Sequence, residues 1–579
     1  MIPKQTKSGS KFIFPIGKDD YKKIIDEKCV YIDKTLLIKE FWEDGSEVIL
    51  ITRPRRFGKT IALSMLRYFF EKTEKSNAYL FENSHIWKEQ GFQELQGTFP
   101  VIFLSFKDIK SDTWNGAYAE LQSLIKSEVD RTLTPIKNLL NEQEKIDYKA
   151  LMDLALEEDK LRVAITDSLK FLTKAFQRIY KKNTIVLIDE YDTPITYAYI
   201  NGFYEKMIQF MRSFLSKGLK GNPCLHRGIM TGVVRTAKDG IVSGLNHPLI
   251  CTMLNPEFST QFGFTEEEVD HLLQTTENTD KKQEIKAWYN GYMIGTKNPQ
   301  LVQPIYNPWS VLNYVKSAAK NPECYWSNTG SKDLLERLIA EAGKTTQEEL
   351  QLLMEGKPLE NKSIDEDVIL LDLDNSEREP WSFLFFAGYI TASNFVFKDK
   401  YFYSLKLPNK EITTLYKELV VSAISKKFSS AKLENLHKTL LLGDVEQFSD
   451  SLNSFVQSLC SSHDLPEPDL ERSLHLFVLG LLASLSNDYL IESNLESGKG
   501  RCDIMLCPFA PSTRYGVLIE FKKGKKENLA DLAKEALHQI KEKDYQNRFY
   551  KLKYEGPILA YGIASHKKEL LVKMETILK

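Results

Sequence analysis

Apolar and polar residues alternate along the first 265 residues with the periodicities of an α/β protein. Short apolar runs that end at turn or charged residues have the length of strands, and longer stretches with helical periodicity separate them. The strand-like runs are 48–52, 101–106, 185–189 and 228–232, and the helical stretches include 61–72 and 118–133. Strands that alternate with helices need crossover connections, so this pattern predicts a mostly parallel sheet covered on both faces.

The pattern changes after residue 265 and again after residue 460. The segment between these points is mainly helical, and its aromatic-rich pieces are expected to fill the core and the contacts between domains. A polar stretch with prolines at 461–469 then precedes a helix, three strands, a helix and a further strand. We therefore predict three domains, at residues 1–265, 266–460 and 461–579.

Composition narrows the class of protein without identifying a function. With 42% hydrophobic and 27% charged residues, the 579-residue chain is typical of folded soluble proteins. Its 77 Lys and Arg nearly balance 79 Asp and Glu, so any nucleic-acid binding must come from a local basic patch. Seven scattered cysteines favour a reducing compartment over a disulfide framework or a structural zinc. The longest apolar runs are too short to span a bilayer, and the start of the chain lacks a signal-peptide pattern.

Residues 53–60, RPRRFGKT, follow one strand-like run and open a helical pattern. In a P-loop the backbone N–H groups turn toward phosphates at a helix N-terminus. Gly58 would allow close backbone approach, Lys59 would contact the β- and γ-phosphates, and Thr60 would bind Mg²⁺. Arg53 stands where GxxxxGK[ST] has its first glycine. A GKT tripeptide also occurs by chance, so this loop alone leaves an ordinary turn as the alternative.

The run 184–189 ends in Asp189 and Glu190, which complete a nucleotide site on the correct element. Asp189 is expected to hold Mg²⁺ through water and Glu190 to polarise the attacking water, with the strand at 101–106 placed between this run and the loop strand. Thr231 is expected to sense the γ-phosphate, and Arg235 either supplies a cation to it or forms a surface salt bridge. The predicted residues for ATP and its Mg²⁺ are Arg55, Arg56, Phe57, Gly58, Lys59, Thr60, Asp189, Thr231 and Arg235.

A second set of acids lies near the carboxyl terminus. Asp503 lies in one strand-like run, and Glu520 and Lys522 lie in the next, two residues apart and therefore on one face. If these strands pair, Asp503 and Glu520 can chelate Mg²⁺ or Mn²⁺, and Lys522 can orient or help deprotonate a water. The alternative is a strand that ends in solvated charges. Further candidates are Glu471 as a helix-borne metal ligand, Gln539 on the following helix, and the lysines after Glu520 as phosphate contacts.

These motifs resemble two known families. Residues 15–35, the RPRRFGKT loop, VLIDEYDTPI and residues 231–247 together resemble the bacterial AAA-ATPase-like family, long carried as a domain of unknown function. That family uses RPRRFGKT as its own loop, so Arg53 is a family trait, and WYNGY, YNPWSVL and LPNKE are similar to its downstream region. The carboxyl-terminal motifs resemble the PD-(D/E)xK nuclease superfamily. Asp503, Glu520 and Lys522 match its core motif, while Glu471 and Gln539 match its helix acid and accessory glutamine.

The resemblances imply a P-loop ATPase domain, a helical middle region and an α/β restriction-endonuclease-like domain. The expected function is ATP-regulated, metal-dependent hydrolysis of nucleic acid, with DNA favoured over RNA, in the bacterial cytoplasm. The alternative is a non-catalytic ATP switch whose last domain only binds nucleic acid or a protein. A helicase is weaker, because no second motor core is visible. No membrane partner is expected, and homo-oligomer formation and secretion as an effector into a host stay open.

Overall fold

The computed structural model describes most of the chain, and its contacts form two compact units. The described residues are 12–153, 157–235, 245, 248–298, 300–317, 321–326, 335, 344–354, 356–367, 380–426, 430–461, 470–482, 485, 488–497, 500–509, 514–566 and 569–578. The N-terminal unit comprises residues 1–330 and 352–414, and the C-terminal unit comprises 331–351 and 415–579. The predicted middle segment is thus shared between the two units, and the three-domain division stays a prediction.

The N-terminal unit contains a five-stranded parallel sheet in the order β2-β3-β4-β1-β5. Its strands are β1 (Val48–Thr52), β2 (Val101–Ser105), β3 (Thr184–Asp189), β4 (Leu225–Gly232) and β5 (Leu249–Cys251). Every residue of β1 and β3 is buried, as expected for a parallel sheet with both faces covered. The predicted parallel sheet is confirmed. The strand between β1 and β3 is β4, however, and not the predicted 101–106 strand, because sheet order does not follow chain order.

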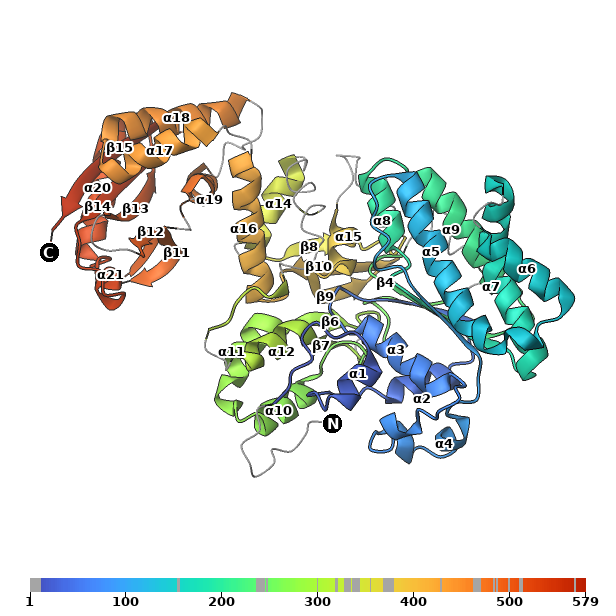
Figure 1. The fold of residues 1–579 in the computed structure, drawn as a ribbon. Coiled ribbons are helices and arrows are strands. Elements are labelled where there is room, and N and C mark those ends of the chain that lie inside the picture. Colours follow the sequence, from blue (N-terminus) through green and yellow to red (C-terminus); the bar gives the residue numbers. More distant parts are fainter. Residues whose placement is uncertain are drawn as a thin grey trace. The chain divides into compact units, whose positions relative to one another are not determined.

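Helices surround this sheet and extend the unit. The principal helices after successive strands are α3 (Lys59–Phe70), α5 (Trp114–Leu133), α6 (Glu142–Met152), α7 (Glu158–Tyr180), α8 (Thr193–Ile200) and α9 (Tyr204–Leu219). Other helices described in this unit include α1 (Tyr21–Asp26), α2 (Leu36–Glu43), α4 (Phe92–Leu95), α10 (Glu266–Thr275), α11 (Lys282–Tyr289), α12 (Pro308–Lys316) and α15 (Trp381–Phe386). Figure 1 shows α5, α7 and α9 side by side, in agreement with their contacts.

Two small antiparallel sheets interrupt the mainly helical pattern predicted after residue 265. One pairs β6 (Tyr292–Ile294) with β7 (Gln303–Ile305), and the other has the order β8 (Leu359–Lys362), β10 (Tyr401–Lys406) and β9 (Thr391–Phe397). Strands of this length give a weaker periodic signal than the helices around them, which is why the sequence pattern did not separate them.

The C-terminal unit is built on a second five-stranded sheet with the order β11-β12-β13-β14-β15. Its strands are β11 (Tyr489–Ser497), β12 (Gly500–Pro508), β13 (Gly516–Lys523), β14 (Ile558–His566) and β15 (Glu569–Ile577). β13 and β14 are parallel and are joined through α20 (Leu529–Glu542), whereas the other neighbours are antiparallel. This α/β arrangement agrees with the predicted element order, to which the structure adds the last strand, β15.

Two hydrophobic clusters cover the faces of the second sheet. On one face, apolar residues of α17 (Ser430–Leu442), α18 (Val445–Ser461) and α19 (Leu470–Leu482) pack against Ile504, Ile519 and Ile563. On the other face, Leu537 and Ile540 of α20 and Phe549 of α21 (Asn547–Lys551) pack with Met505 and Leu518. Sheet residues therefore alternate between the two clusters, as the period of a strand requires.

Glu411 is a fully buried acid near the start of α16 (Lys410–Lys426). The hydroxyl of Ser310 donates to both of its carboxylate oxygens at 2.9 Å, and the backbone N–H of Trp326 donates at 2.9 Å. The indole N–H of Trp326 donates in turn to the carbonyl of Arg55 at 3.2 Å. Burial raises the pKa of Glu411 to about 7, and the hydrogen bonds partly offset this effect. The helix continues beyond Thr414 into the C-terminal unit.

Within the described residues, no helix combines the length and apolar character required to cross a bilayer. The cysteines described are free thiols: Cys29, Cys224, Cys251, Cys324, Cys502 and Cys507. Neither observation identifies a function.

The raised pKa of Glu411 predicts a pH-dependent stability. Because folding raises this pKa from an ordinary 4.5 to about 7, the folded state holds the proton more tightly than the unfolded state. The protonated side chain therefore contributes its full stabilisation of the folded state below about pH 4.5. This contribution, about 3 kcal/mol of unfolding free energy, is lost as the pH rises to 7. Thermal unfolding across this range should show that Glu411→Gln lowers the pH dependence of the midpoint. Equal slopes for the variant and the wild type would contradict this assignment.

Candidate functional site

The loop between β1 and α3 has the backbone of an anion-binding turn. Arg56 has a φ of 68° and Gly58 a φ of 86°, so the chain passes twice through the left-handed region before the helix. α3 begins at Lys59, directly after Gly58. The first N–H groups of a helix have no partners within the helix and favour a negative charge. The loop can therefore receive phosphate oxygens, as the sequence predicts.

Lys59 and Thr60 lie at the start of this helix, with their side chains in different surroundings. The Lys59 ammonium is buried and donates to the carbonyls of Arg53 at 2.9 Å and Pro54 at 3.0 Å. Burial lowers its pKa, and the nearby acid Glu190 opposes this effect. The Thr60 hydroxyl donates to Asp189 at 2.7 Å. The hydrogen bond between Thr60 and Asp189 thus joins the loop helix to the acidic end of β3.

Asp189 is completely buried at the carboxyl edge of the sheet. Besides Thr60, it accepts hydrogen bonds from Thr231 at 2.7 Å and Ser105 at 3.3 Å. Burial raises the pKa of Asp189, while the bonds from Thr231 and Thr60 act in the opposite direction. Ser105 was not predicted, although it pairs with Asp189 in the register of β2 and β3. Its position as the last polar residue of β2 is the signal that could have identified it.

Glu190 and Asp192 follow β3 and face different partners. Glu190 has a φ of 50°, which is uncommon for a residue with a side chain, and it accepts a hydrogen bond from Thr193 at 3.2 Å. Buried Asp192, which was not predicted, accepts the backbone N–H groups of Val233 at 2.8 Å and Val234 at 3.0 Å. It therefore fixes the exit of β4 beside the end of β3. A positive φ such as that of Glu190 is common at functional sites.

Arg53 explains how the loop works without its first glycine. Its guanidinium is completely buried and donates to the carbonyls of Thr52 and Cys251 at 2.9 Å and of Glu257 at 3.2 Å. Burial lowers the pKa of Arg53 to about 10. The side chain thus ties the end of β1 to the end of β5 and the segment after it. Arg53 is therefore a structural anchor of the loop.

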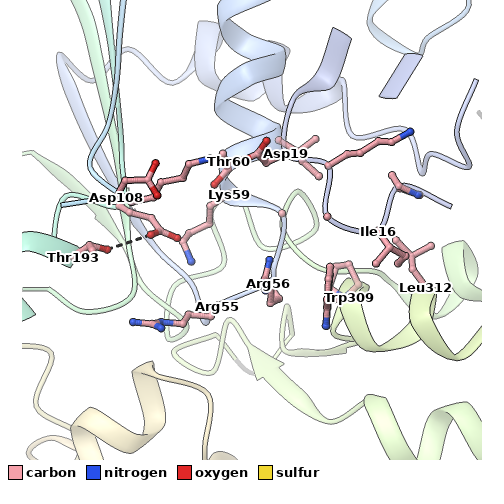
Figure 2. Close-up of a pocket in the computed structure, with 18 of the residues that line it drawn as sticks. Ile16, Asp19, Arg55, Arg56, Lys59, Thr60, Asp108, Thr193, Trp309 and Leu312 are labelled. Carbon is pink, nitrogen blue, oxygen red and sulfur yellow. Dashed lines mark hydrogen bonds and ion pairs between the residues drawn. The ribbon is translucent and has the colours of Figure 1, made fainter. Parts of the chain in front are cut away.

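A cavity of about 400 Å³ lies over the loop. Figure 2 shows Lys59, Thr60 and Thr193 toward one end and Ile16, Trp309 and Leu312 toward the other. Gly58 and Glu190 also line it, as do Arg55 and Arg56 from the loop. Lys107, Asp108 and Lys110, which follow β2, were not predicted and contribute further charged groups. One cavity therefore joins a charged end to an apolar end.

Four of the predicted nucleotide residues do not line this cavity, namely Phe57, Asp189, Thr231 and Arg235. The ring of Phe57 is buried against Tyr292, with 5.1 Å between the ring centroids. Arg235 forms an ion pair with Asp367, with 3.1 Å between the charged atoms, which matches the salt-bridge alternative. Thr231 reaches the site through Asp189. The roles of these residues toward a nucleotide stay predictions.

Asp503, Glu520 and Lys522 are brought together in the C-terminal unit. Ile504 pairs with Ile519, so continuing the register by one residue places Asp503 opposite Glu520. The Asp503 carboxylate accepts the backbone N–H of Phe521 at 2.8 Å. Glu520 is 3% exposed, and burial raises the pKa of Asp503. The strand pairing that the sequence prediction required is therefore present.

Gln539 connects the acid of this cluster to its lysine. Its amide nitrogen donates to Glu520 and, at 3.1 Å, to the hydroxyl of Tyr545, while its carbonyl accepts from the Lys522 ammonium. Gln539 thus faces back toward β13 as predicted, whereas no sequence motif pointed to Tyr545. The helix that bears Gln539 approaches the sheet at Gly562, where an added Cβ would lie 2.1 Å from the carbonyl oxygen of Ala533. This glycine therefore sets the distance between α20 and the cluster.

The remaining candidate of this cluster is Glu471 on α19, the helix that also bears His475. A ring nitrogen of His475 donates to the carbonyl of Asp503 at 2.9 Å, and the ring packs against Phe521, so His475 supports β12. The side chain of Glu471 lies outside the described residues. Among the groups that are described, no three His, Cys, Asp or Glu side chains form a metal cluster.

Comparison with known proteins gives two matches within the chain. Residues 15–242 match the predicted AAA-ATPase family and residues 469–575 match the PD-(D/E)XK nuclease superfamily, which confirms both resemblances. An uncharacterized protein from the vnfD 5′ region of Azotobacter chroococcum mcd 1 is 24% identical over 546 residues, 92% of this chain and 93% of that protein. A Walker-type ATPase of Pyrococcus abyssi has a TM-score of 0.35 and 14% identity, covering 67% of this chain and 96% of its own.

The role of Arg53 can be tested by restoring the missing glycine. Arg53→Gly makes the loop conform to GxxxxGK[ST] but removes the donors to the carbonyls of Thr52, Cys251 and Glu257. We expect a loss of about 3 kcal/mol in the free energy of unfolding, measured by denaturant titration. Arg55→Gly, two residues along on the cavity wall, is the matched control and should cost much less. A fully stable Arg53→Gly protein would contradict the anchoring role.

The close approach at Gly562 gives a second prediction. In Gly562→Ala the new methyl group meets the backbone of α20, and we expect a loss of about 1–3 kcal/mol in unfolding free energy. Gly524→Ala is the control, because its Cβ would meet Leu532 Cδ1, the end of a flexible side chain, at 2.1 Å. Denaturant unfolding of both variants checks the difference. An equal effect of the two substitutions would show that the helix does not depend on the glycine.

Proposed function

We propose that this chain, which carries an AAA-ATPase-like domain and a PD-(D/E)XK nuclease superfamily domain, is an ATP-regulated, metal-dependent nuclease. The substrate is the phosphodiester backbone of nucleic acid, with DNA favoured over RNA. The observation that carries the proposal is the grouping of Asp503, Glu520, Lys522 and Gln539 at the paired edge of β12 and β13. Family membership alone does not establish activity, whereas this grouping supplies the chemistry that hydrolysis requires.

The donor atoms of this cluster fit a hard divalent cation. Asp503 and Glu520 offer carboxylate oxygens, which Mg²⁺ and Mn²⁺ prefer, and Glu471 is the proposed third ligand. When bound, such a cation supplies positive charge to a phosphate oxygen and lowers the pKa of a bound water. The backbone N–H of Phe521 holds the Asp503 carboxylate in place for this task. Glu520 is buried and Asp503 is half-buried, so a bound cation would compensate charges that water reaches only in part.

Lys522 is the group proposed to handle the attacking water. Its ammonium is held by the carbonyl of Gln539, and the amide of the same side chain binds Glu520. Gln539 therefore fixes the lysine next to the acid that holds the cation. From this position Lys522 can orient a water or stabilise the extra charge on the phosphate in the transition state.

The N-terminal cavity is proposed to bind ATP with Mg²⁺. Gly58 and the following N–H groups, with Lys59, would hold the phosphates, and Thr60 and Asp189 carry the oxygens suited to Mg²⁺. Glu190 lines the same cavity and would polarise a water near the γ-phosphate. Occupation of the loop would regulate the nuclease. Assembly into homo-oligomers is compatible with this scheme.

A non-catalytic switch is the second candidate. It is favoured by one observation, namely that Gln539 already binds one carboxylate oxygen of Glu520 and the ammonium of Lys522. According to this hypothesis, the C-terminal unit binds nucleic acid or protein without cleaving it. The function then depends on nucleotide binding at Lys59 and not on Asp503.

Nuclease assays of the full chain distinguish these candidates. We expect cleavage of plasmid or single-stranded DNA with Mg²⁺ or Mn²⁺, and Asp503→Asn and Lys522→Ala should each lower the rate by about 100-fold. Lys551→Ala is the matched control, because Lys551 is exposed at the end of α21 and lies outside both the cluster and the run of lysines that follows Glu520. Lys59→Ala should remove the effect of ATP on the rate. RNA is assayed in parallel to test the preference for DNA.

A folded protein that binds ATP but is as inert as Lys522→Ala on all substrates would exclude the nuclease and favour the switch. A protein that cleaves DNA equally with and without ATP would retain the nuclease and remove the regulation.

A further inference from the structure

The N-terminal cavity extends beyond the groups proposed to bind phosphate, to an apolar end. This end is built by Pro15 and Ile16, which precede α1, and by Trp309 and Leu312 of α12. These segments are almost 300 residues apart in sequence, yet they line the same cavity as Gly58, Lys59 and Thr60. The four apolar side chains are only partly buried or line the cavity surface, so they present a wall to whatever occupies it.

Trp309 is held in a fixed orientation at this wall. Its backbone N–H donates to the side chain of Asn307 at 2.9 Å, which caps the start of α12, and its indole N–H donates to the carbonyl of Tyr325 at 3.2 Å. The guanidinium of Arg56 lies 4.4 Å from the centre of the ring. In Figure 2 Trp309 stands between Arg56 on one side and Ile16 with Leu312 on the other. The indole is therefore a rigid plane in the wall.

We propose that this apolar end is a subsite for the base of the bound nucleotide, in which a purine ring packs against Trp309, Ile16 and Leu312. The inference rests on the proposed function, because it requires a nucleoside triphosphate whose phosphates lie at Gly58, Lys59 and Thr60. A flat heteroaromatic ring binds most favourably against a fixed aromatic plane that has aliphatic neighbours. The cavity volume of about 400 Å³ lies in the range of pockets that enclose small ligands.

The charge distribution along the cavity sets the direction of the nucleotide. Lys59 and the helix start make one end suited to anions, whereas Ile16, Trp309 and Leu312 give the other end apolar walls. Lys18 and Asp19, which follow Ile16 in the chain, also line the cavity. Arg56 lies on the ring of Trp309 and so brings a positive charge next to the apolar end, where the sugar and the first phosphate would lie. A triphosphate without a base would therefore fill only the charged end. The difference in binding free energy between ATP and tripolyphosphate therefore measures the contribution of the base.

Calorimetric titration of the full-length protein with ATP and with inorganic tripolyphosphate, both with Mg²⁺, tests the subsite. Trp309→Ala should weaken ATP binding by about tenfold while the affinity for tripolyphosphate changes by less than about twofold. Trp309→Phe keeps an aromatic plane and should retain most of the ATP affinity. Trp114→Ala on α5 is the matched control, because Trp114 lies outside the residues that line this cavity.

Each result decides the question. Retained tripolyphosphate binding shows that a variant is folded, and if Trp309→Ala loses it, Leu312→Gln provides the same comparison at the same wall. If ATP and tripolyphosphate bind the wild type equally, or if Trp309→Ala and Leu312→Gln leave ATP binding unchanged, the base subsite is overturned and the phosphate site survives. If the wild type binds neither ligand, the proposed nucleotide function itself fails, and the subsite fails with it.

Discussion

A carboxylate that a fold removes from water must be compensated by hydrogen bonds, and the N-terminal unit is organised around one such group. Asp189 accepts from Thr60, Ser105 and Thr231, which come from α3, β2 and β4. Losing any donor would leave part of a buried charge without compensation, which is more costly than the loss of an exposed contact. The position of the P-loop helix relative to the sheet edge, and hence the shape of the cavity, depends on this requirement.

Gln539 provides a comparable constraint in the C-terminal unit, where one amide side chain orients an acid and a lysine from the same strand. The geometry depends on how closely α20 approaches the sheet, which Gly562 permits. In the N-terminal unit, the Trp326 indole binds the loop carbonyl of Arg55 while its backbone binds Glu411 at the start of α16. Ser310, the neighbour of Trp309, binds the same acid. The cavity wall and α16 therefore share their supporting residues.

The sequence predicted those features that local patterns encode. Gly58, Lys59 and Asp189 were found because a turn, a helix start and a buried strand end each leave a periodic or compositional trace, and Asp503 with Glu520 followed from strand period. The anchoring role of Arg53 could not be predicted from local patterns, because its partners include the backbone carbonyls of Cys251 and Glu257, which are distant in sequence. Trp309 is likewise defined by its contact with Arg56, which is distant in sequence. Tyr545 lies six residues from Gln539 but belongs to no motif. Phe57 and Arg235 lie in the right stretches of sequence but have side chains directed to other partners.

Each of the two compact units is built from two separate segments of the chain. Residues 331–351 belong with the C-terminal unit, whereas residues 352–414, which follow them, belong with the N-terminal unit. As the ribosome releases the polypeptide in order, residues 331–351 emerge before the first unit is complete, and the rest of their own unit begins only at residue 415. Synthesis of the two units is thus interleaved, and no single proteolytic cut can release either one intact.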